Sequence, residues 1–139
     1  MSDIFSNIRD GVADATIVLK NDYVTAFEDV RPSAPVHVLI IPNIKLSTVN
    51  DASADAVPYL GNMILAAAEI AKQKQIDEGG YRLIINCNKH GGQEIFYLHM
   101  HLVGGCELGY MLSLPNPSRK LMKKLQKQDD DAPGRTGSA

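Results

Sequence analysis

The sequence predicts an α+β protein with a five-stranded antiparallel sheet, one long helix and one short helix. Five short runs rich in β-branched and aromatic residues are typical of strands, and one longer stretch has apolar residues at helical spacing. Turns that contain glycine, proline or asparagine separate these segments. Five strands with one main helix fit an antiparallel sheet that a helix covers on one face.

The N-terminal part supplies the short helix and three strands. Apolar residues within 4–8 have the spacing of a short amphipathic helix. Two strands are expected over 16–20 and 23–27, joined by a turn at Asn21-Asp22. The β-branched run 36–41 predicts a central strand.

The following part supplies the long helix and two further strands. Asp51 or Ser53 is expected to cap this helix. Its predicted apolar face consists of Val57, Leu60, Ile64, Ala67, Ala68 and Ala71. Gly79-Gly80 is expected to end the helix, and the last two strands are expected over 82–87 and 94–103.

Composition and charge are those of a small globular protein. The 139 residues suit one domain, and a net charge of −2 with a pI of about 6.0 gives no basic field for nucleic acid or a membrane. No apolar run approaches the roughly 18 residues of a membrane span, and the start does not have the pattern of a signal peptide. Cys87 and Cys106 show no evident pairing, which indicates a reducing compartment. We therefore expect a cytoplasmic protein without a nucleic-acid or membrane partner.

The C-terminal part differs in composition from the rest of the chain. We expect one domain over 1–112 and a partly disordered extension over 113–139. Within the extension, a basic run precedes three aspartates. Three apolar residues of the basic run predict one short helix, and a flexible tail is expected beyond Gln128.

Two histidines one residue apart carry the functional prediction. Alternate side chains of an extended strand point to opposite faces, so Tyr97, His99 and His101 share one face. The residues between them are apolar and can bury on the other face. An imidazole near neutral pH can act as a nucleophile, a proton carrier or a metal ligand.

A glycine turn precedes the two histidines. Gly91 and Gly92 allow backbone N–H groups to converge on an anion without a Cβ in the way, and Gln93 adds a polar side chain. Taken alone, a glycine pair is more typical of a plain hairpin turn. Joined to two histidines on one face, the pair favours a phosphate site with a histidine directed at phosphorus.

Two other interpretations of the histidines stay open. They can be ordinary half-buried residues, or two ligands of a metal ion for which His37 or His90 is a distant third donor. No further ligand stands at a recognisable spacing. We therefore expect no metal ion at this site.

The region around the histidines resembles the signature of the histidine triad (HIT) family, in its Hint branch. The resemblance is carried by residues 91–105, extends through 80–86 and 26–42, and covers about residues 4–112. It implies a HIT-like fold, with a sheet that continues across a homodimer. It also implies an AMP-like or GMP-like purine nucleotide as the ligand, and no cofactor.

Tyr97 departs from the pattern of this family. The pattern has three alternating histidines, and Tyr97 stands at the first of them. The resemblance assigns nucleophilic attack to His99, with its other ring nitrogen held by the Tyr97 carbonyl, and contact with phosphate and leaving group to His101. A phenol titrates at about pH 10, so Tyr97 is expected to pack against His37, the family's other pocket histidine, without carrying a proton. Activity is therefore expected to be altered or reduced and not lost.

The resemblance also implies a set of nucleotide-binding residues. Besides the two histidines, these are Asp29, Val30, Asn86, Gly92, Gln93 and Glu94. Asp29 is expected to accept hydrogen bonds from the ribose, Val30 to contact the base, and Asn86 to reach the sugar–phosphate junction. A turn-forming aspartate and a strand-ending asparagine are the structural alternatives for Asp29 and Asn86.

The predicted activity is hydrolysis of the P–N bond of purine nucleoside 5′-phosphoramidates, through a nucleotidyl-histidine intermediate on His99. Two alternatives stay open. One is a nucleotide-binding or regulatory HIT protein with weak catalysis, and the other is a dinucleoside polyphosphate hydrolase.

Overall fold

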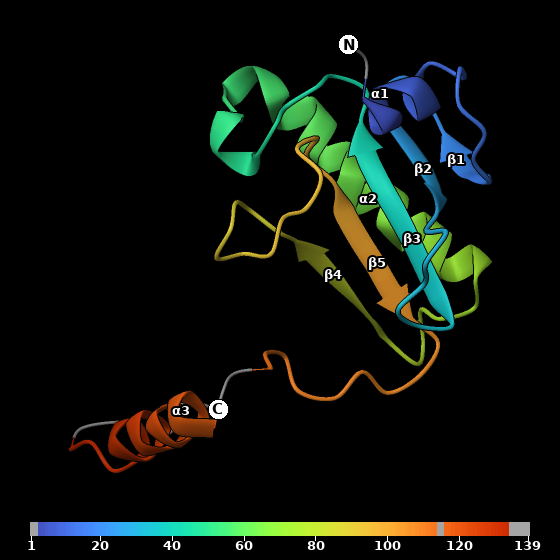
Figure 1. Ribbon diagram of the computed structural model, residues 1–139. Helices are drawn as coiled ribbons and strands as arrows, with labels where there is room; N and C mark the ends of the chain where they lie inside the picture. The colour runs from blue at the N-terminus through green and yellow to red at the C-terminus, as the bar shows by residue number, and fades with distance from the viewer. Residues whose placement is uncertain (1–2, 114–115, 134–139) are drawn as a thin grey trace. The chain divides into compact units, whose positions relative to one another are not determined.

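The computed structural model describes residues 3–113 and 116–133 (Figure 1). The chain forms two compact units, Met1–Glu107 and Leu108–Ala139, whereas the sequence analysis places the division at residue 112. Among the described residues, no helix is long and apolar enough to cross a membrane.

The first unit is built on one antiparallel sheet of five strands in the order β1-β2-β3-β5-β4. The strands are β1 (Ile17–Lys20), β2 (Val24–Glu28), β3 (Val36–Pro42), β4 (Tyr81–Ile85) and β5 (Met100–Gly104). This sheet, with its helices, confirms the predicted α+β class. Asn21 makes the first turn, because its side-chain oxygen accepts hydrogen bonds from the N–H groups of Tyr23 and Val24.

β3 is the central strand and pairs with β2 on one side and β5 on the other. In its register with β5, Leu39 is opposite His101 and His37 is opposite Val103. Because side chains alternate along a strand, His37 and His101 project from the same face of neighbouring strands. The sheet thereby brings together two histidines that are far apart in the sequence.

The long helix α2 (Val57–Gln73) covers the other face of the sheet, and Figure 1 shows it running behind the strands. Between them lies a core cluster of Val24, Ala26, Val38, Ile40, Met63, Ala66, Ala67, Ile70, Ala71, Ile76, Met100 and Leu102. The predicted helix face was partly wrong, because Val57 and Ile64 are exposed. The buried side follows the small alanines, which allow the helix to approach the sheet closely.

The predicted ends of α2 were also wrong. Two short 3₁₀ helices, η1 (Val49–Asp51) and η2 (Ala54–Ala56), precede α2. Ser53 makes no side-chain cap, and Asp51 belongs to η1, where it accepts a hydrogen bond from the N–H of the N-cap residue Thr48. At the other end, α2 stops before Gly79-Gly80, because Gln75 adopts a left-handed conformation with φ of 59°.

The short helix α1 (Ile4–Arg9) lies on the face of the sheet opposite α2. Asp3 caps it by accepting a hydrogen bond from the N–H of Ser6. α1 and the sheet bury a second cluster, which consists of Phe5, Ile8, Phe27, Leu39, Ile41 and Tyr97. This smaller core borders the site described below.

The last predicted strand is shorter than expected. β5 begins at Met100, and residues 94–99 form an irregular segment in which the N–H of Leu98 donates to the carbonyl of Leu46. The alternation of side chains persists through this segment. Leu98 is fully buried, and Met100 joins the core under α2, while Tyr97 joins the opposite cluster.

Within the described part of the second unit, the chain forms one helix, α3 (Asn116–Asp130). Leu121, Met122 and Leu125, which predicted a short helix here, lie within it and are exposed. The helix continues past Gln128, where the sequence predicted a flexible tail. The last residues of that predicted tail, 134–139, lie outside the described residues.

Candidate active site

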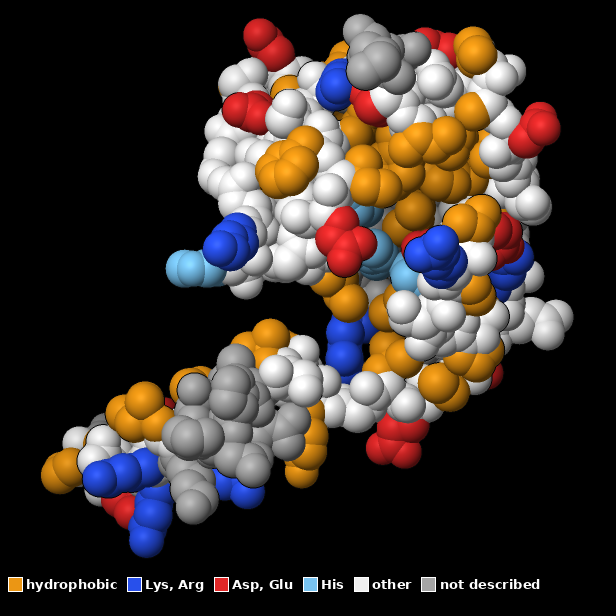
Figure 2. Space-filling model, in the orientation of Figure 1, with side chains coloured by type: hydrophobic (Ala, Val, Ile, Leu, Met, Phe, Trp, Pro, Cys, Tyr) orange, Lys and Arg blue, Asp and Glu red, His pale blue; other side chains and the backbone are white. Residues whose placement is uncertain are grey.

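A cavity of about 630 Å³ opens on the α1 face of the sheet, within the first unit. Its walls come from α1, from the end of β2 with the loop to β3, and from the loop before β5. Figure 2 shows pale-blue histidine atoms at the bottom of this hollow, with apolar side chains beside them. The cavity therefore has a polar floor and an apolar side, as a nucleotide site needs.

His99 lies at the floor of the cavity, directly before β5. Its side chain is only 7% exposed, yet it lines the cavity. Its Nδ1 lies 2.7 Å from the carbonyl oxygen of Tyr97, as the resemblance implied. Because a carbonyl can only accept, Nδ1 must carry the proton, and Nε2 keeps a free lone pair.

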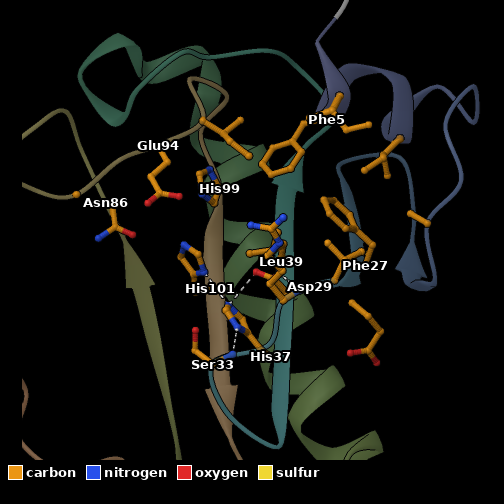
Figure 3. Close-up of a pocket in the computed structure, with 18 of the residues that line it drawn as sticks. Phe5, Phe27, Asp29, Ser33, His37, Leu39, Asn86, Glu94, His99 and His101 are labelled. Atoms are coloured by element: carbon orange, nitrogen blue, oxygen red, sulfur yellow. Dashed lines mark hydrogen bonds and ion pairs between the residues drawn. The ribbon is translucent and has the colours of Figure 1, made fainter.

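His101 and His37 form a hydrogen-bonded pair beside His99, drawn with dashed lines in Figure 3. The N–H of Ser33 donates to Nδ1 of His37 at 3.0 Å, so the proton of a neutral His37 is on Nε2. That Nε2 lies 2.9 Å from Nδ1 of His101 and donates to it. Neutral His101 then carries its own proton on Nε2, which makes this nitrogen a hydrogen-bond donor.

Burial keeps the imidazoles of His99 and His101 neutral near pH 7. Desolvation lowers the pKa of His99, although the Tyr97 carbonyl and Asp29 oppose the shift. Desolvation, together with repulsion from His99 and His37, lowers the pKa of His101 to about 4. A neutral imidazole is the nucleophilic form, so the environment favours His99 as a nucleophile.

Asp29 and Val30 lie in the loop after β2 at the side of the cavity. One carboxylate oxygen of Asp29 accepts from the N–H of Arg31 at 2.8 Å, which is the turn-forming role considered above. The other oxygen faces the cavity histidines, 3.4 Å from Nε2 of His37. Val30 is 92% exposed at the rim, where its side chain is available to a ligand.

Asp29, His37 and His101 also offer a set of metal-binding atoms. One oxygen or nitrogen atom of each lies within 4.8 Å of the others. Two imidazoles and one carboxylate match the donor set that Zn²⁺ accepts in sites with an open position. The residues present therefore fit a zinc ion, in competition with the hydrogen bond between the two histidines.

Steric contact and backbone conformation explain the glycine turn before the histidines. A Cβ on Gly91 would lie 2.4 Å from the carbonyl oxygen of Cys87, and Gly92 has φ of +79°. The N–H of Gly92 donates to Lys89 and that of Gln93 to Asn88, within the turn itself. The amides of Gly92 and Gln93, two of the expected nucleotide-binding residues, are thus already engaged.

Gln93 has a structural role that differs from the expected one. Its side chain is buried, accepts from the N–H of Asn88 and donates to the carbonyls of Ser47 and Ile95. It therefore holds the loop in place and is not directed at a ligand. A side chain that can both accept and donate is well suited to a loop with unpaired backbone groups.

Asn86 and Glu94 line the cavity on the side of the glycine turn (Figure 3). The amide nitrogen of Asn86 donates to the carbonyl of Gly91 at 2.6 Å, which leaves its oxygen for another partner. The exposed carboxylate of Glu94 points into the opening near His99. Among the described residues, nothing accepts a hydrogen bond from the backbone N–H of Glu94, which remains available for an anion.

Tyr97 is placed differently from the expectation. Its side chain is fully buried in the cluster under α1, where it packs against Phe5 and Arg9. The histidine that contacts His101 is His37. The expected packing of Tyr97 against His37 is therefore replaced by packing against α1.

The apolar wall of the cavity was not among the site residues predicted from the sequence. This wall consists of Ile4, Phe5, Ile8, Ala15, Phe27, Leu39 and Ile95. Phe5 packs against one of the histidines, with its ring centroid 5.2 Å from that of His99. The amphipathic spacing of residues 4–8 was the available signal, but it does not tell which part of the sheet the helix covers.

The fold and the site together define a class of protein. It is a small α+β protein with clustered neutral imidazoles at the floor of a pocket large enough for a nucleotide. The HIT domain family matches residues 10–108, and the chain belongs to this family.

Related proteins agree with this assignment. The chain is 56% identical to the purine nucleoside phosphoramidase of Escherichia coli (strain K12) over 110 residues. This alignment covers 79% of this chain and 92% of that protein. A HIT family hydrolase from Legionella pneumophila Philadelphia 1 is 39% identical, with a TM-score of 0.75 over 78% of this chain and 96% of that chain. A HIT family hydrolase from Clostridium thermocellum is 37% identical, with a TM-score of 0.76 over 79% and 96%.

Proposed function

We propose that this protein hydrolyses the P–N bond of purine nucleoside 5′-phosphoramidates, with His99 as the nucleophile. The observation that carries the proposal is the free lone pair on Nε2 of His99, created at the cavity floor by the hydrogen bond from Nδ1 to the Tyr97 carbonyl. The 56% identity to a purine nucleoside phosphoramidase supports the same reaction.

The first step is attack of Nε2 of His99 on the α-phosphorus. A P–N bond to Nε2 of His99 forms while the bond to the leaving nitrogen breaks, and the leaving nitrogen takes up a proton from solvent and departs as an amine. His99 keeps its proton on Nδ1 and becomes a nucleotidyl-imidazolium. The Nε2–H of His101 and the free N–H of Glu94 donate to the phosphoryl oxygens, where negative charge increases. The His101 donor is held in advance by the pairing of His101 with His37.

The second step is attack of water on the nucleotidyl-histidine. The bond between phosphorus and Nε2 of His99 breaks, the attacking water gives up a proton to solvent, the nucleoside monophosphate leaves, and the imidazole returns to its neutral state. The reaction needs no metal ion or cofactor, because protein donors serve both steps.

The apolar wall and the loop after β2 are proposed to hold the nucleoside. Phe5, Phe27 and Leu39 offer apolar contact to the base, which suits adenine and guanine alike. The Asp29 carboxylate is proposed to accept hydrogen bonds from the ribose hydroxyls, and Asn86 to contact the sugar–phosphate junction through its free oxygen.

Two further proposals concern the setting of the protein. We infer a homodimer whose sheet continues across the interface, and a cytoplasmic location, which agrees with the two free cysteines. Sedimentation or size-exclusion chromatography with light scattering tests the dimer.

The activity is tested with a fluorogenic adenosine phosphoramidate. The wild type is expected to turn over, and His99→Ala is expected to lose at least about a thousandfold in kcat, the scale for removal of a nucleophile. His90→Ala is the matched control, because His90 is exposed and does not line the cavity. AMP binding without turnover would instead support the regulatory protein, and a preference for diadenosine polyphosphate would support the polyphosphate hydrolase.

A further inference from the structure

The short helix α1 forms one wall of the cavity and contacts the proposed nucleophile. Ile4, Phe5 and Ile8 all line the cavity. The ring of Phe5 packs edge-on against Phe27, with 5.4 Å between ring centroids, and against His99 at 5.2 Å. The position of α1 therefore determines both the width of the apolar pocket and the packing on the His99 ring.

A helix of six residues is not stable by itself, so α1 depends on tertiary contacts. At its start, Asp3 caps the helix and forms an ion pair of 2.6 Å with Lys45. At its end, the side chain of Lys20 donates to the carbonyl of Arg9 at 2.6 Å. The Arg9 guanidinium pairs with Asp10 through Nε and Nη2 and contacts Tyr97 through Nη1.

The contact between Arg9 and Tyr97 combines two interactions. Nη1 of Arg9 donates to the Tyr97 hydroxyl at 3.2 Å, and the guanidinium carbon lies 5.8 Å from the centre of the Tyr97 ring. The same hydroxyl donates to the carbonyl of Pro42, the last residue of β3, at 2.5 Å. One buried hydroxyl thus connects α1 to the central strand, with its donor and its acceptor both used.

From these contacts we infer that Tyr97 is a positioning residue, which holds α1 and Phe5 in place as the wall of the nucleoside pocket. Tyr97 then acts on nucleotide affinity through Arg9 and Phe5, and not on proton transfer. The effect on substrate rests on the proposed function, whereas the anchoring of α1 does not.

The geometry of the imidazoles supports this division of roles. His99 is oriented by the backbone carbonyl of residue 97, which is present whatever amino acid stands at that position. His101 is oriented by His37. Burial raises the pKa of the Tyr97 hydroxyl, so the group keeps its proton and remains a donor to Pro42. An imidazole at position 97 is shorter than a phenol and cannot reach both Pro42 and Arg9.

The test compares Tyr97→Phe and Arg9→Met with the wild type. Both variants are expected to weaken AMP binding by about three- to tenfold, the range for one net hydrogen bond, and to raise KM by the same factor. Hydrogen exchange over residues 4–9 is expected to become several times faster in both. The pH profile of kcat is expected to stay that of the wild type, because the hydrogen bonds that orient His99 and His101 do not involve the changed side chains.

Tyr23→Phe is the matched control for loss of a phenol hydroxyl. Tyr23 packs against Tyr59, away from the cavity, so its variant is expected to keep the wild-type exchange and AMP affinity. The double variant Arg9→Met/Tyr97→Phe is expected to bind AMP no more weakly than the poorer single variant, because both changes break the same connection.

Three results would overturn the inference. The first is unchanged exchange over residues 4–9 in Tyr97→Phe or, if that variant does not fold, in Arg9→Met. The second is unchanged AMP affinity in the same variant. The third is a Tyr97→His protein with a higher kcat and an altered pH profile. A wild type that binds AMP but does not cleave phosphoramidates would refute the proposed function alone, since exchange and affinity remain measurable.

Discussion

His37 and His101 form a hydrogen-bonded pair across two neighbouring strands, with Nε2 of His37 2.9 Å from Nδ1 of His101. Ser33 sets the direction of the hydrogen bond within the pair, because its N–H donates to Nδ1 of His37 and so places the proton of neutral His37 on Nε2. His101 is thereby committed to presenting an N–H group on Nε2. The orientation of one donor at the cavity floor thus depends on a residue 64 positions earlier in the chain.

The pair predicts that His37 matters although it is not the nucleophile. His37→Ala is expected to lower kcat/KM by about tenfold, because His101 loses the donor that fixes its tautomer. His37→Gln keeps an N–H donor and is expected to lose less. Steady-state kinetics with an adenosine phosphoramidate measure both variants, and full activity in His37→Ala would show that the pairing is unimportant.

The lowered pKa of His99 predicts the acid side of the pH–rate profile. Only the neutral ring attacks phosphorus, and burial keeps it neutral below the ordinary histidine value of about 6.5. The ratio kcat/KM is therefore expected to stay level as pH falls through 6.5 and to decline only at lower pH. A profile with its midpoint at or above 6.5 would contradict the burial argument.

The same burial predicts how stability depends on pH. Unfolded histidines take up protons at about pH 6.5, whereas His101 in the folded protein does so only at about 4. Between these values the unfolded state binds more protons, so the free energy of unfolding is expected to fall as pH falls. Denaturant unfolding of wild type and His101→Asn at several pH values measures this, and the variant is expected to have the flatter dependence.

Glu94 predicts an electrostatic effect on substrate binding. Its exposed carboxylate lies at the opening near His99, where a phosphoryl group would arrive. Glu94→Gln is expected to lower KM about two- to fivefold at low salt, and less at high salt, because an exposed charge is screened. Glu69→Gln, which removes an exposed carboxylate on α2, is the matched control. Equal KM values in both variants would show that the Glu94 charge does not reach the ligand.

The cluster of Asp29, His37 and His101 predicts inhibition by zinc. Zn²⁺ bound there would replace the hydrogen bond between the histidines and compete with nucleotide. Asp29→Asn is expected to raise the inhibition constant about tenfold, whereas Asp14→Asn, which changes a cavity aspartate outside the cluster, is expected to leave it unaltered. Chelation with EDTA is expected to cost the wild type no activity, and a loss would show that a metal takes part.

The arrangement of the histidines was predictable because it depends on local geometry. An extended chain alternates its side chains even outside a regular strand, so Tyr97, His99 and His101 share a face although β5 begins only at Met100. The sheet around them was predictable for a similar reason, since short apolar runs and turn residues mark each strand.

The tertiary parts of the site were not predictable in this way. Gln93 was expected to bind the nucleotide. Its side chain is instead hydrogen-bonded to the carbonyl of Ser47 in a distant loop and to two backbone groups of its own loop. Phe5 looked like ordinary helix core, but the docking of α1 places it against His99. Which residues line a cavity depends on how elements pack, and periodicity reports only which side of each element is apolar.

The orienting partner of His99 belongs to the main chain. Mutation can replace a side chain at one codon, but the carbonyl of residue 97 persists in every possible replacement. The side chain at position 97 can therefore change without loss of the hydrogen bond that orients the imidazole of His99. A protein that exchanges one ring for another at position 97 keeps the hydrogen bond that orients His99.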